Sequence, residues 1–299
     1  MAILIVGSVA LDTIETPLGK VIEVLGGAAV YSAVSASFFA PVKLIGVVGE
    51  DFPEEYLKIL SERNIDLTGL VRLPGKTFRW EGKYLEDMNQ RQTIRTELNV
   101  FEQFRPELKE DHKSLSYVFL ANIHPELQLE VLEQVEEPEL VVCDTMNLWI
   151  NTAREKLEEV LSQVDILLLN DEEARLLTRE YQLARAGRKL LERGLKAVVI
   201  KRGEHGATIH TREGIFFAPA YPLEIVKDPT GAGDSFAGGF IGYLWQEGRS
   251  DFSELKKAGI YGSVVASFTV EEFGLKRLLE VSKEDIEQRF REFKELVSF

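Results

Sequence analysis

Three small residues followed by a carboxylate make the strongest chemical signal in the sequence. Gly231, Ala232 and Gly233 precede Asp234, and a helical pattern of apolar residues continues beyond them. Small residues let the backbone turn tightly, and the free N–H groups at a helix start bind an anion. Asp234 could therefore deprotonate a hydroxyl while these amides stabilise a phosphoryl group in transfer. From the residues alone, an ordinary helix N-terminus after a glycine-rich turn is an equally good interpretation.

A second signal combines an amide and a carboxylate at the end of an apolar run. Asn170 ends the run ILLLN, and Glu173 follows three residues later. Ligands gather at the carboxyl ends of strands in open α/β sheets, so Glu173 could reach a magnesium ion through water. The same spacing is that of a capping box, in which the two side chains accept hydrogen bonds from each other's backbone amides.

Short apolar runs that alternate with amphipathic segments must position these residues. The runs, which are apolar almost throughout, cover residues 2–7, 42–48, 117–121, 140–144, 166–170 and 197–201. Strands that are buried on both faces have this composition. Between them, residues 126–135, 152–164 and 185–193 carry apolar residues at helical spacing. The alternation predicts an α/β fold with a mostly parallel sheet covered by helices on both faces.

Two segments interrupt this alternation. Residues 13–25 and 77–99 mix polar and apolar residues without a helical stripe. Such segments are typical of exposed antiparallel strands, and we expect them to form a small β-sheet lid. Long surface hairpins are the alternative. We therefore predict a single domain over residues 1–299 with two lid inserts.

Taken in order, the motifs resemble the PfkB, or ribokinase-like, carbohydrate kinase family over nearly the whole chain. DPTGAGDSF at 228–236 is similar to the family's C-terminal signature, with Pro229 where the family pattern has Thr. GSVALD, the Gly26-Gly27 pair, LLLNDEEARLLT and VVIKRGEHGA precede it in the family's order. The resemblance implies a ribokinase-like, Rossmann-type sandwich. It also implies phosphorylation of a hydroxyl on a sugar or sugar-like molecule by ATP.

The resemblance assigns roles to individual residues. Asp234 would be the catalytic base, and the amides of Gly231, Ala232, Gly233 and Asp234 would form the anion hole. The residues that match the ATP site are Asn170, Glu173, Lys201, Gly203, Gly206 and, beside adenine, Ser263. Glu173 would reach Mg²⁺ through water, and Asp228 matches a position that in some members helps to hold a monovalent cation such as K⁺. The residues that match the substrate side are Asp12, Gly26, Gly27 and Tyr31.

Tyr31 marks a departure from the family. It stands about where relatives often carry an Asn that contacts the sugar, which argues against a ribose-type binding mode. Tyr31 or Trp80 could instead stack a base, so a nucleoside kinase of the same fold is the alternative. A sugar- or nucleotide-binding protein without turnover is a third reading. Polar residues at two other strand ends, Asn122, His124 and Asn147, could line a pocket, although turn or cap roles are favoured for them.

Composition narrows the classes of partner. The chain has 35 Lys and Arg against 49 Asp and Glu, a net charge of −14, which disfavours binding to nucleic acid or to an anionic membrane surface. Four His and one Cys give neither a zinc pattern nor a disulfide framework. The absence of a signal peptide and of a membrane-length apolar run predicts a cytoplasmic protein. The sequence PGKT at 74–77 lacks the glycine spacing of a Walker A loop.

We also expect a homodimer. The second lid segment carries aromatic and aliphatic residues that thin strands cannot bury alone. In relatives such lids pair between subunits.

Overall fold

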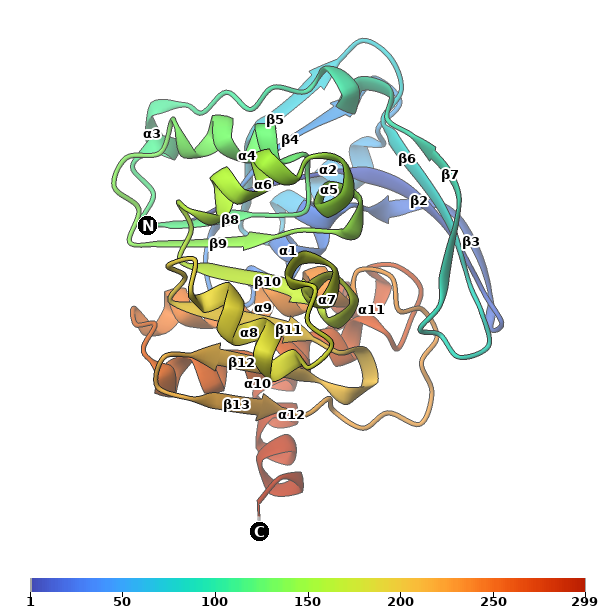
Figure 1. Ribbon diagram of the computed structural model, residues 1–299. Coiled ribbons are helices and arrows are strands. Elements are labelled where there is room, and N and C mark those ends of the chain that lie inside the picture. The colour runs from blue at the N-terminus through green and yellow to red at the C-terminus, as the bar shows by residue number, and fades with distance from the viewer. Residues whose placement is uncertain (1, 299) are drawn as a thin grey trace.

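A nine-stranded sheet forms the centre of the computed structural model, which describes residues 2–298 (Figure 1). Its strand order is β13-β12-β11-β10-β9-β8-β1-β4-β5. The strands are β1 (Ile3–Val6), β4 (Val42–Gly49), β5 (Ile65–Leu73), β8 (Tyr117–Leu120), β9 (Leu140–Asp144), β10 (Ile166–Asn170), β11 (Ala197–Lys201), β12 (Ala207–Thr211) and β13 (Ile215–Ala218). Neighbours from β5 to β11 pair in parallel, and β12 and β13 add an antiparallel edge. The predicted α/β class is confirmed. The sheet also contains three strands that the sequence did not predict, β5, β12 and β13.

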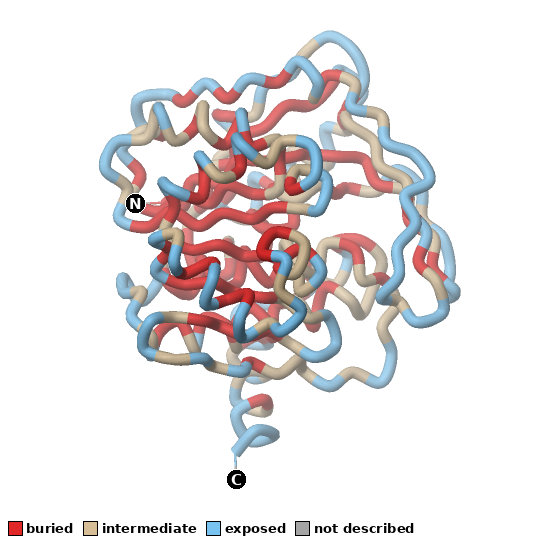
Figure 2. Tube along the Cα trace, viewed as in Figure 1, coloured by how far each residue is buried: buried red, intermediate tan, exposed pale blue. Residues whose placement is uncertain are grey.

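Helices cover both faces of this sheet (Figure 1), and each face has its own apolar core. The burial of the chain is greatest at the strands in the middle of the molecule (Figure 2). Successive side chains of a strand point to opposite faces, so Ile3 and Ile5 of β1 enter one core while Leu4 and Val6 enter the other. The first core is closed by α1 (Ala28–Ala36), α2 (Glu54–Ser61), α9 (Ala232–Glu247), α10 (Phe252–Thr269), α11 (Lys276–Glu280) and α12 (Lys283–Leu296). The second is closed by α4 (Pro125–Leu132), α5 (Asn147–Thr152), α6 (Arg154–Leu161), α7 (Asp171–Thr178) and α8 (Leu183–Leu191). The remaining short helices are η1 (Asn99–Gln103), α3 (Glu110–Lys113) and η2 (Gly203–His205).

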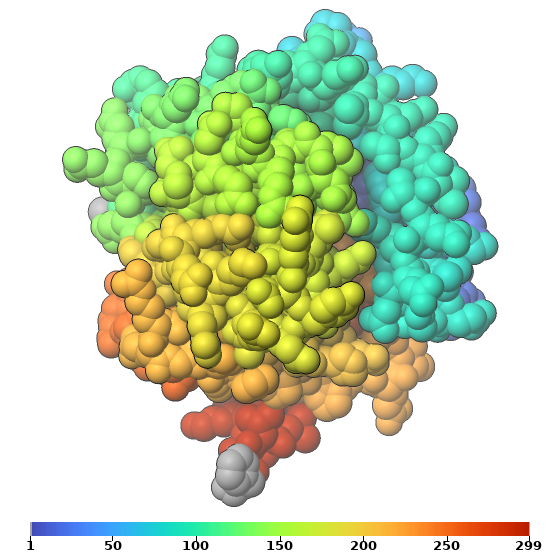
Figure 3. All heavy atoms as spheres, in the orientation of Figure 1, coloured from blue at the N-terminus to red at the C-terminus, as the bar shows by residue number. Residues whose placement is uncertain are grey.

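A second, four-stranded sheet stands beside the main body. Its strands are β2 (Ala10–Thr16), β3 (Gly19–Gly26), β6 (Phe78–Tyr84) and β7 (Arg91–Glu97), in the order β3-β2-β6-β7. β2 and β6 pair in parallel, which joins two segments that are far apart in the sequence, while the outer pairs are antiparallel. We call this sheet the lid. Figure 3 shows a recess between the lid and the body.

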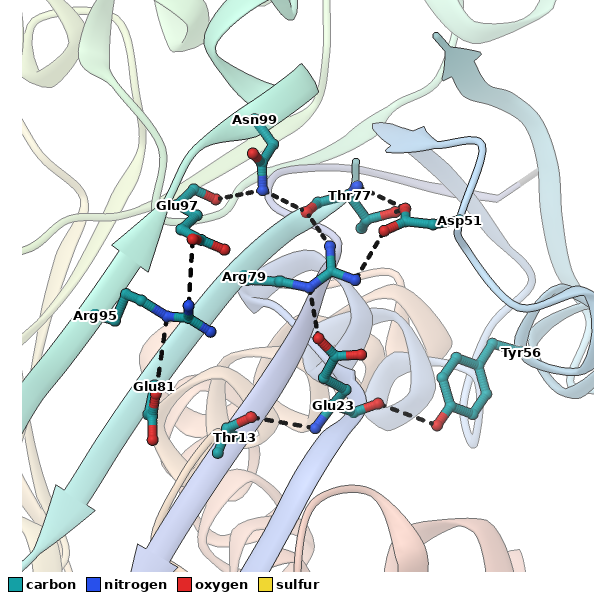
Figure 4. A network of polar contacts seen from close by, with 10 residues as sticks. All are labelled: Thr13, Glu23, Asp51, Tyr56, Thr77, Arg79, Glu81, Arg95, Glu97 and Asn99. Carbon is teal, nitrogen blue, oxygen red and sulfur yellow. Dashed lines mark hydrogen bonds and ion pairs between the residues drawn. The ribbon is translucent and has the colours of Figure 1, made fainter. Parts of the chain in front are cut away.

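A polar network fastens the start of β6 to the body (Figure 4). The buried hydroxyl of Thr77 donates to Asp51 Oδ1 at 2.8 Å and accepts from the amide of Gly49 at 3.0 Å. Arg79 forms ion pairs with Asp51 at 2.8 Å and Glu23 at 2.7 Å. The PGKT segment therefore has a structural role at the root of the lid, in agreement with the rejection of a Walker A loop.

No helix within residues 2–298 is both long enough and apolar enough to span a membrane.

Candidate active site

The carboxyl ends of three adjacent strands bring polar side chains to one edge of the main sheet. Asn170 at the end of β10 is in register with Lys201 at the end of β11, and Asp144 ends the neighbouring β9. In open α/β sheets ligands bind at this edge. Asp144 has no counterpart among the site residues expected from the sequence. Its position directly after the buried run LVVC was the signal that could have identified it.

The loop before α9 presents unpaired amides beside a carboxylate. Gly231 caps the helix in the left-handed region, with φ 74°, and a Cβ there would lie 2.4 Å from the ring of Tyr31. Only glycine satisfies both constraints. The amides of Gly231 and Gly233 have no backbone acceptor within the described chain, whereas that of Ala232 makes a long bond, 3.3 Å, to the Pro229 carbonyl. The loop can therefore bind an anion with at least two N–H groups.

Asp234 lies in the first turn of α9 with a half-buried side chain. Burial, and after it the nearby charge of Asp144, raises its pKa to about 6, against the opposing effects of Lys201 and Arg91. A carboxyl with this pKa is ionised at neutral pH and basic enough to accept a proton. The carbonyl of Asp234 accepts a hydrogen bond from Ser32 of α1 at 3.1 Å, which holds the two helices together.

A buried ion pair places a positive charge against this loop. Lys201 Nζ lies 2.6 Å from Asp144 Oδ2, and 3.3 Å from where a Cβ on Gly233 would be. Three carboxylates, from Asp144, Glu173 and Asp234, keep the pKa of Lys201 raised despite its burial. The ammonium group is therefore a permanent positive charge beside the amides of this loop.

Asn170 and Glu173 form the capping box that was the alternative to a nucleotide-site role. Asn170 Oδ1 accepts from the Glu173 amide at 2.8 Å, and Glu173 Oε2 accepts from the Asn170 amide at 2.7 Å. Burial, with a contribution from Asp144, raises the pKa of Glu173 to about 7. One carboxylate oxygen, Oε1, remains outside the capping box. Glu173 can therefore act in the capping box and still offer Oε1 to a ligand.

The carboxylate of Asp12 lies against the backbone of Gly26 and Gly27, the glycine pair that precedes α1. A Cβ on Gly26 would lie 2.0 Å from Asp12 Oδ2, so the absence of a side chain lets the carboxylate approach the backbone. Burial raises the pKa of Asp12 to about 7, although a hydrogen bond from the Gly27 amide opposes the shift. Asp228 and Asp234 raise it further, which shows that these three carboxylates share one region. Asp12, Gly26 and Gly27, which were expected on the substrate side, therefore lie together.

Tyr31 is 1% exposed, and its ring packs beneath Gly231. A covered ring cannot stack on a base in this conformation. Its hydroxyl is buried without a hydrogen-bond partner in the described chain. Trp80 of β6, by contrast, is half-buried and is in register with Asp12 across the lid, so both side chains lie on the lid face toward the site.

The turn that contains Gly203 and Gly206 faces the tip of the lid. Both glycines have positive φ and bound the single turn of η2. The side-chain oxygen of Asn89, in the β6–β7 loop, lies 3.1 Å from where a Cβ on Gly203 would be. Ser263 is buried in the middle of α10, and within residues 2–298 no described hydrogen bond links it to this turn.

Asp228 ties two loops together. Its Oδ1 accepts from the Thr230 amide at 2.8 Å and its Oδ2 from the Gly274 amide at 2.9 Å. Burial raises its pKa. Thr230, whose amide donates to Asp228, also donates a hydrogen bond from its hydroxyl to the hydroxyl of Tyr84 in the lid, at 3.2 Å. Tyr84 and Thr230 are thus a direct lid-to-loop contact that was not expected from the sequence.

The other polar strand ends have local structural roles. His124 caps α4 by accepting from the Glu126 amide at 3.2 Å, and its ring meets Trp149 edge to face. Asn122 accepts from the indole nitrogen of Trp149 at 2.9 Å, and Asn147 begins α5. These contacts agree with the turn and cap interpretation.

Residues 3–281 match the model of the pfkB family carbohydrate kinases. A cytidine kinase of Thermococcus kodakarensis is 34% identical over 246 residues, which cover 80% of this chain and 87% of that protein. The solved nucleoside kinase of Methanocaldococcus jannaschii has a TM-score of 0.79 at 23% identity, with 98% of this chain and 99% of that one covered. The solved ribokinase of Thermotoga maritima gives 0.77 at 22% identity, with 97% and 99% covered.

Proposed function

The chain belongs to the pfkB family of carbohydrate kinases, and from that membership we propose that it transfers the γ-phosphoryl group of ATP to a nucleoside hydroxyl. That it is a phosphotransferase acting on a hydroxyl follows from the family. The nucleoside acceptor and the roles of individual residues are the proposal. The observation that carries it is the carboxylate of Asp234 beside the amides of Gly231 and Gly233, which have no backbone acceptor among residues 2–298.

A nucleoside is preferred over a free sugar for two reasons. The relative that is 34% identical over most of both chains is named a cytidine kinase. In addition, Trp80 offers a half-buried indole on the same lid face as Asp12. An aromatic ring near a hydroxyl-binding carboxylate suits a molecule with both a base and a sugar.

In the proposed reaction Asp234 accepts the proton of the acceptor hydroxyl. The hydroxyl oxygen forms a bond to the γ-phosphorus as the bond from that phosphorus to the β-bridging oxygen breaks, and ADP leaves. The amides of Gly231 and Gly233 hydrogen-bond the phosphoryl oxygens, and the Lys201 ammonium adds positive charge beside them. Catalysis then consists of positioning and charge stabilisation.

The residues present fit a magnesium ion that is held mainly by the nucleotide and by water. Within residues 2–298 no cluster of three His, Cys, Asp or Glu is arranged to bind a metal directly. Magnesium in kinases keeps several waters and takes few protein ligands. Glu173, with its free Oε1, would hold such a water, and Asn170 would fix the position of Glu173. When bound, the metal supplies charge neutralisation to the phosphates.

The monovalent-cation role of Asp228 is part of the same proposal. Each of its oxygens accepts one backbone hydrogen and keeps a further lone pair. Replacing KCl by choline chloride in the assay tests it, and unchanged turnover would remove potassium from the account.

An acceptor panel tests the proposed function. The protein is incubated with ATP and Mg²⁺ and either cytidine, uridine, adenosine or inosine, or ribose or fructose, and ADP release and phosphorylated product are measured. We expect at least one nucleoside to give product with a kcat/KM at least tenfold above any free sugar. Product from free sugars alone would overturn the nucleoside assignment. Binding of nucleoside and ATP without product would instead favour a protein without turnover.

A further inference from the structure

A bulge in β7 places two arginines of the lid on opposite faces. Arg95 pairs with Glu81 and Thr93 pairs with Gly82, so Ile94 between them is an extra residue, and Arg91 then pairs with Tyr84. In a regular strand Arg91 and Arg95, four residues apart, would share a face. The extra residue reverses the alternation. The sequence gives no sign of this bulge.

Arg95 faces away from the site and is neutralised there. Its guanidinium forms ion pairs with Glu97 at 3.3 Å and Glu81 at 3.8 Å (Figure 4).

Arg91 faces the site and is not neutralised. Its Cζ lies 5.4 Å from the centroid of the Trp80 ring, and its strand partner Tyr84 contacts Thr230. Thr230 directly precedes Gly231, so this inner face of the lid reaches the anion-hole loop. Within residues 2–298 no carboxylate lies within 4.0 Å of the Arg91 guanidinium.

The charge of Arg91 nevertheless acts on the three carboxylates that line the site. It lowers the pKa of Asp12, Glu173 and Asp234, as one of the lesser causes for each. These residues mark the acceptor side, the nucleotide side and the base. Arg91 therefore lies near the point where acceptor and nucleotide meet. A cation that has no ion-pair partner in a protein of net charge −14 is available for an anionic ligand.

We propose that Arg91 is a catalytic residue that binds the phosphoryl group during transfer when the lid is closed. The planar guanidinium can donate two parallel hydrogen bonds to phosphoryl oxygens while its plane stays near the indole of Trp80. No bond to Arg91 forms or breaks. The inference rests on the proposed function, because it assigns one more group to the same reaction.

The experiment compares Arg91→Gln and Arg91→Lys with the matched control Arg95→Gln, which changes the outward arginine of the same strand. Two quantities are measured: kcat with the best acceptor, and the dissociation constants of the ADP and AMP-PCP complexes by calorimetry in the presence of Mg²⁺. AMP-PCP, which cannot transfer its γ-phosphoryl group, isolates the contact to that group from the chemistry.

We expect Arg91→Gln to lower kcat about 100- to 1,000-fold, the typical effect of removing one donor to a developing charge. It should weaken AMP-PCP about tenfold, as expected for the loss of about 1.4 kcal/mol of a charge-assisted hydrogen bond, and leave ADP unchanged. Arg91→Lys should recover part of the loss, because the charge remains and the two-pronged geometry does not. Arg95→Gln should match the wild type in every measurement.

The inference would be overturned if Arg91→Gln and Arg95→Gln had the same kcat and the same dissociation constants. It would also be overturned if Arg91→Gln weakened the binding of ADP and of AMP-PCP to the same extent. If the wild type phosphorylated no acceptor, the proposed function would fail. The comparison of ADP with AMP-PCP would still decide whether Arg91 binds the γ-phosphoryl group.

Discussion

The hydroxyl of Tyr84 in the lid accepts a hydrogen bond from the hydroxyl of Thr230, at 3.2 Å, one residue before Gly231 of the proposed anion hole. Both side chains are buried. The lid is therefore connected to the loop that would hold the phosphoryl group, and lid position and loop geometry are coupled.

Tyr84→Phe should loosen this coupling while keeping the ring. A typical buried hydrogen bond contributes about 1 kcal/mol, so we expect the KM of the acceptor to rise about fivefold, with a smaller change in kcat. Tyr181→Phe is the matched control, because Tyr181 is 89% exposed. Steady-state kinetics with varied acceptor measure both. Identical KM values for the two variants would show that the contact does not govern lid closure.

Glu173→Gln separates the capping role from the magnesium role. Glutamine at the third helical position can still accept from the Asn170 amide, so the capping box should be kept. Because burial raises the pKa of Glu173, removal of its charge should leave the melting temperature near neutral pH equal to that of the wild type or higher. The lost charge should raise the Mg²⁺ concentration for half-maximal activity severalfold. Asn170→Ala removes the cap and should lower stability by about 1 kcal/mol. A Glu173→Gln variant with an unchanged Mg²⁺ dependence would restrict Glu173 to capping.

The activity should fall on the acid side of neutrality. Burial raises the pKa of Asp234 to about 6. The carboxylate is therefore fully ionised well above pH 6, and this basic form is lost as the pH falls through 6. Glu173, with a pKa raised to about 7, protonates over an overlapping range and should steepen the decline. The pH profile of kcat/KM reports these groups in the free enzyme. A profile that is flat from pH 8 to pH 5 would contradict the assignment of Asp234 as the base.

The lid is also the basis of the proposed homodimer. Ile22 is 71% exposed and Ile94 is 58% exposed, and each lies on a lid strand with charged neighbours. We propose that these side chains pack against a second copy of the chain. Ile22→Glu and Ile94→Glu should then convert a dimer to a monomer in sedimentation at micromolar concentration. A wild type that sediments as a monomer would remove the dimer from the account.

The sequence predicted the main sheet well because its strands are buried on both faces. Their apolar runs, such as ILLLN, which ends at Asn170, and AVVIK, which ends at Lys201, are easy to recognise because almost every residue in them is buried. The antiparallel edge strands gave a weaker pattern, because β13 exposes Ile215 and Phe217, and the buried β12 contains the polar residues Thr208 and His210. The glycine loop before Asp234 was visible because its backbone geometry restricts the residue types.

Site residues that depend on register were not predictable. Arg91 reaches the inner lid face only because Ile94 is extra, and no local composition marks that bulge. Tyr84 and Thr230 are 146 positions apart, and they meet only because the lid folds over the loop. Asp144 was within reach of prediction, because it ends a buried strand beside β10.

The replacement of one carboxylate oxygen at position 234 tests the central claim most directly. Asp234→Asn keeps the size of the side chain and removes its ability to accept a proton. Because burial disfavours the charged form, the variant should be at least as stable as the wild type at pH 8, and this difference should vanish below pH 4. Thermal unfolding across that range verifies the fold of the variant.

With the fold verified, the decisive quantity is kcat of Asp234→Asn on the best acceptor. General-base catalysis contributes about 100- to 10,000-fold, so the account predicts a decrease of at least 100-fold with the dissociation constant of AMP-PCP within about threefold of the wild type. A variant that keeps more than a tenth of the wild-type kcat would contradict the role of Asp234 as the base.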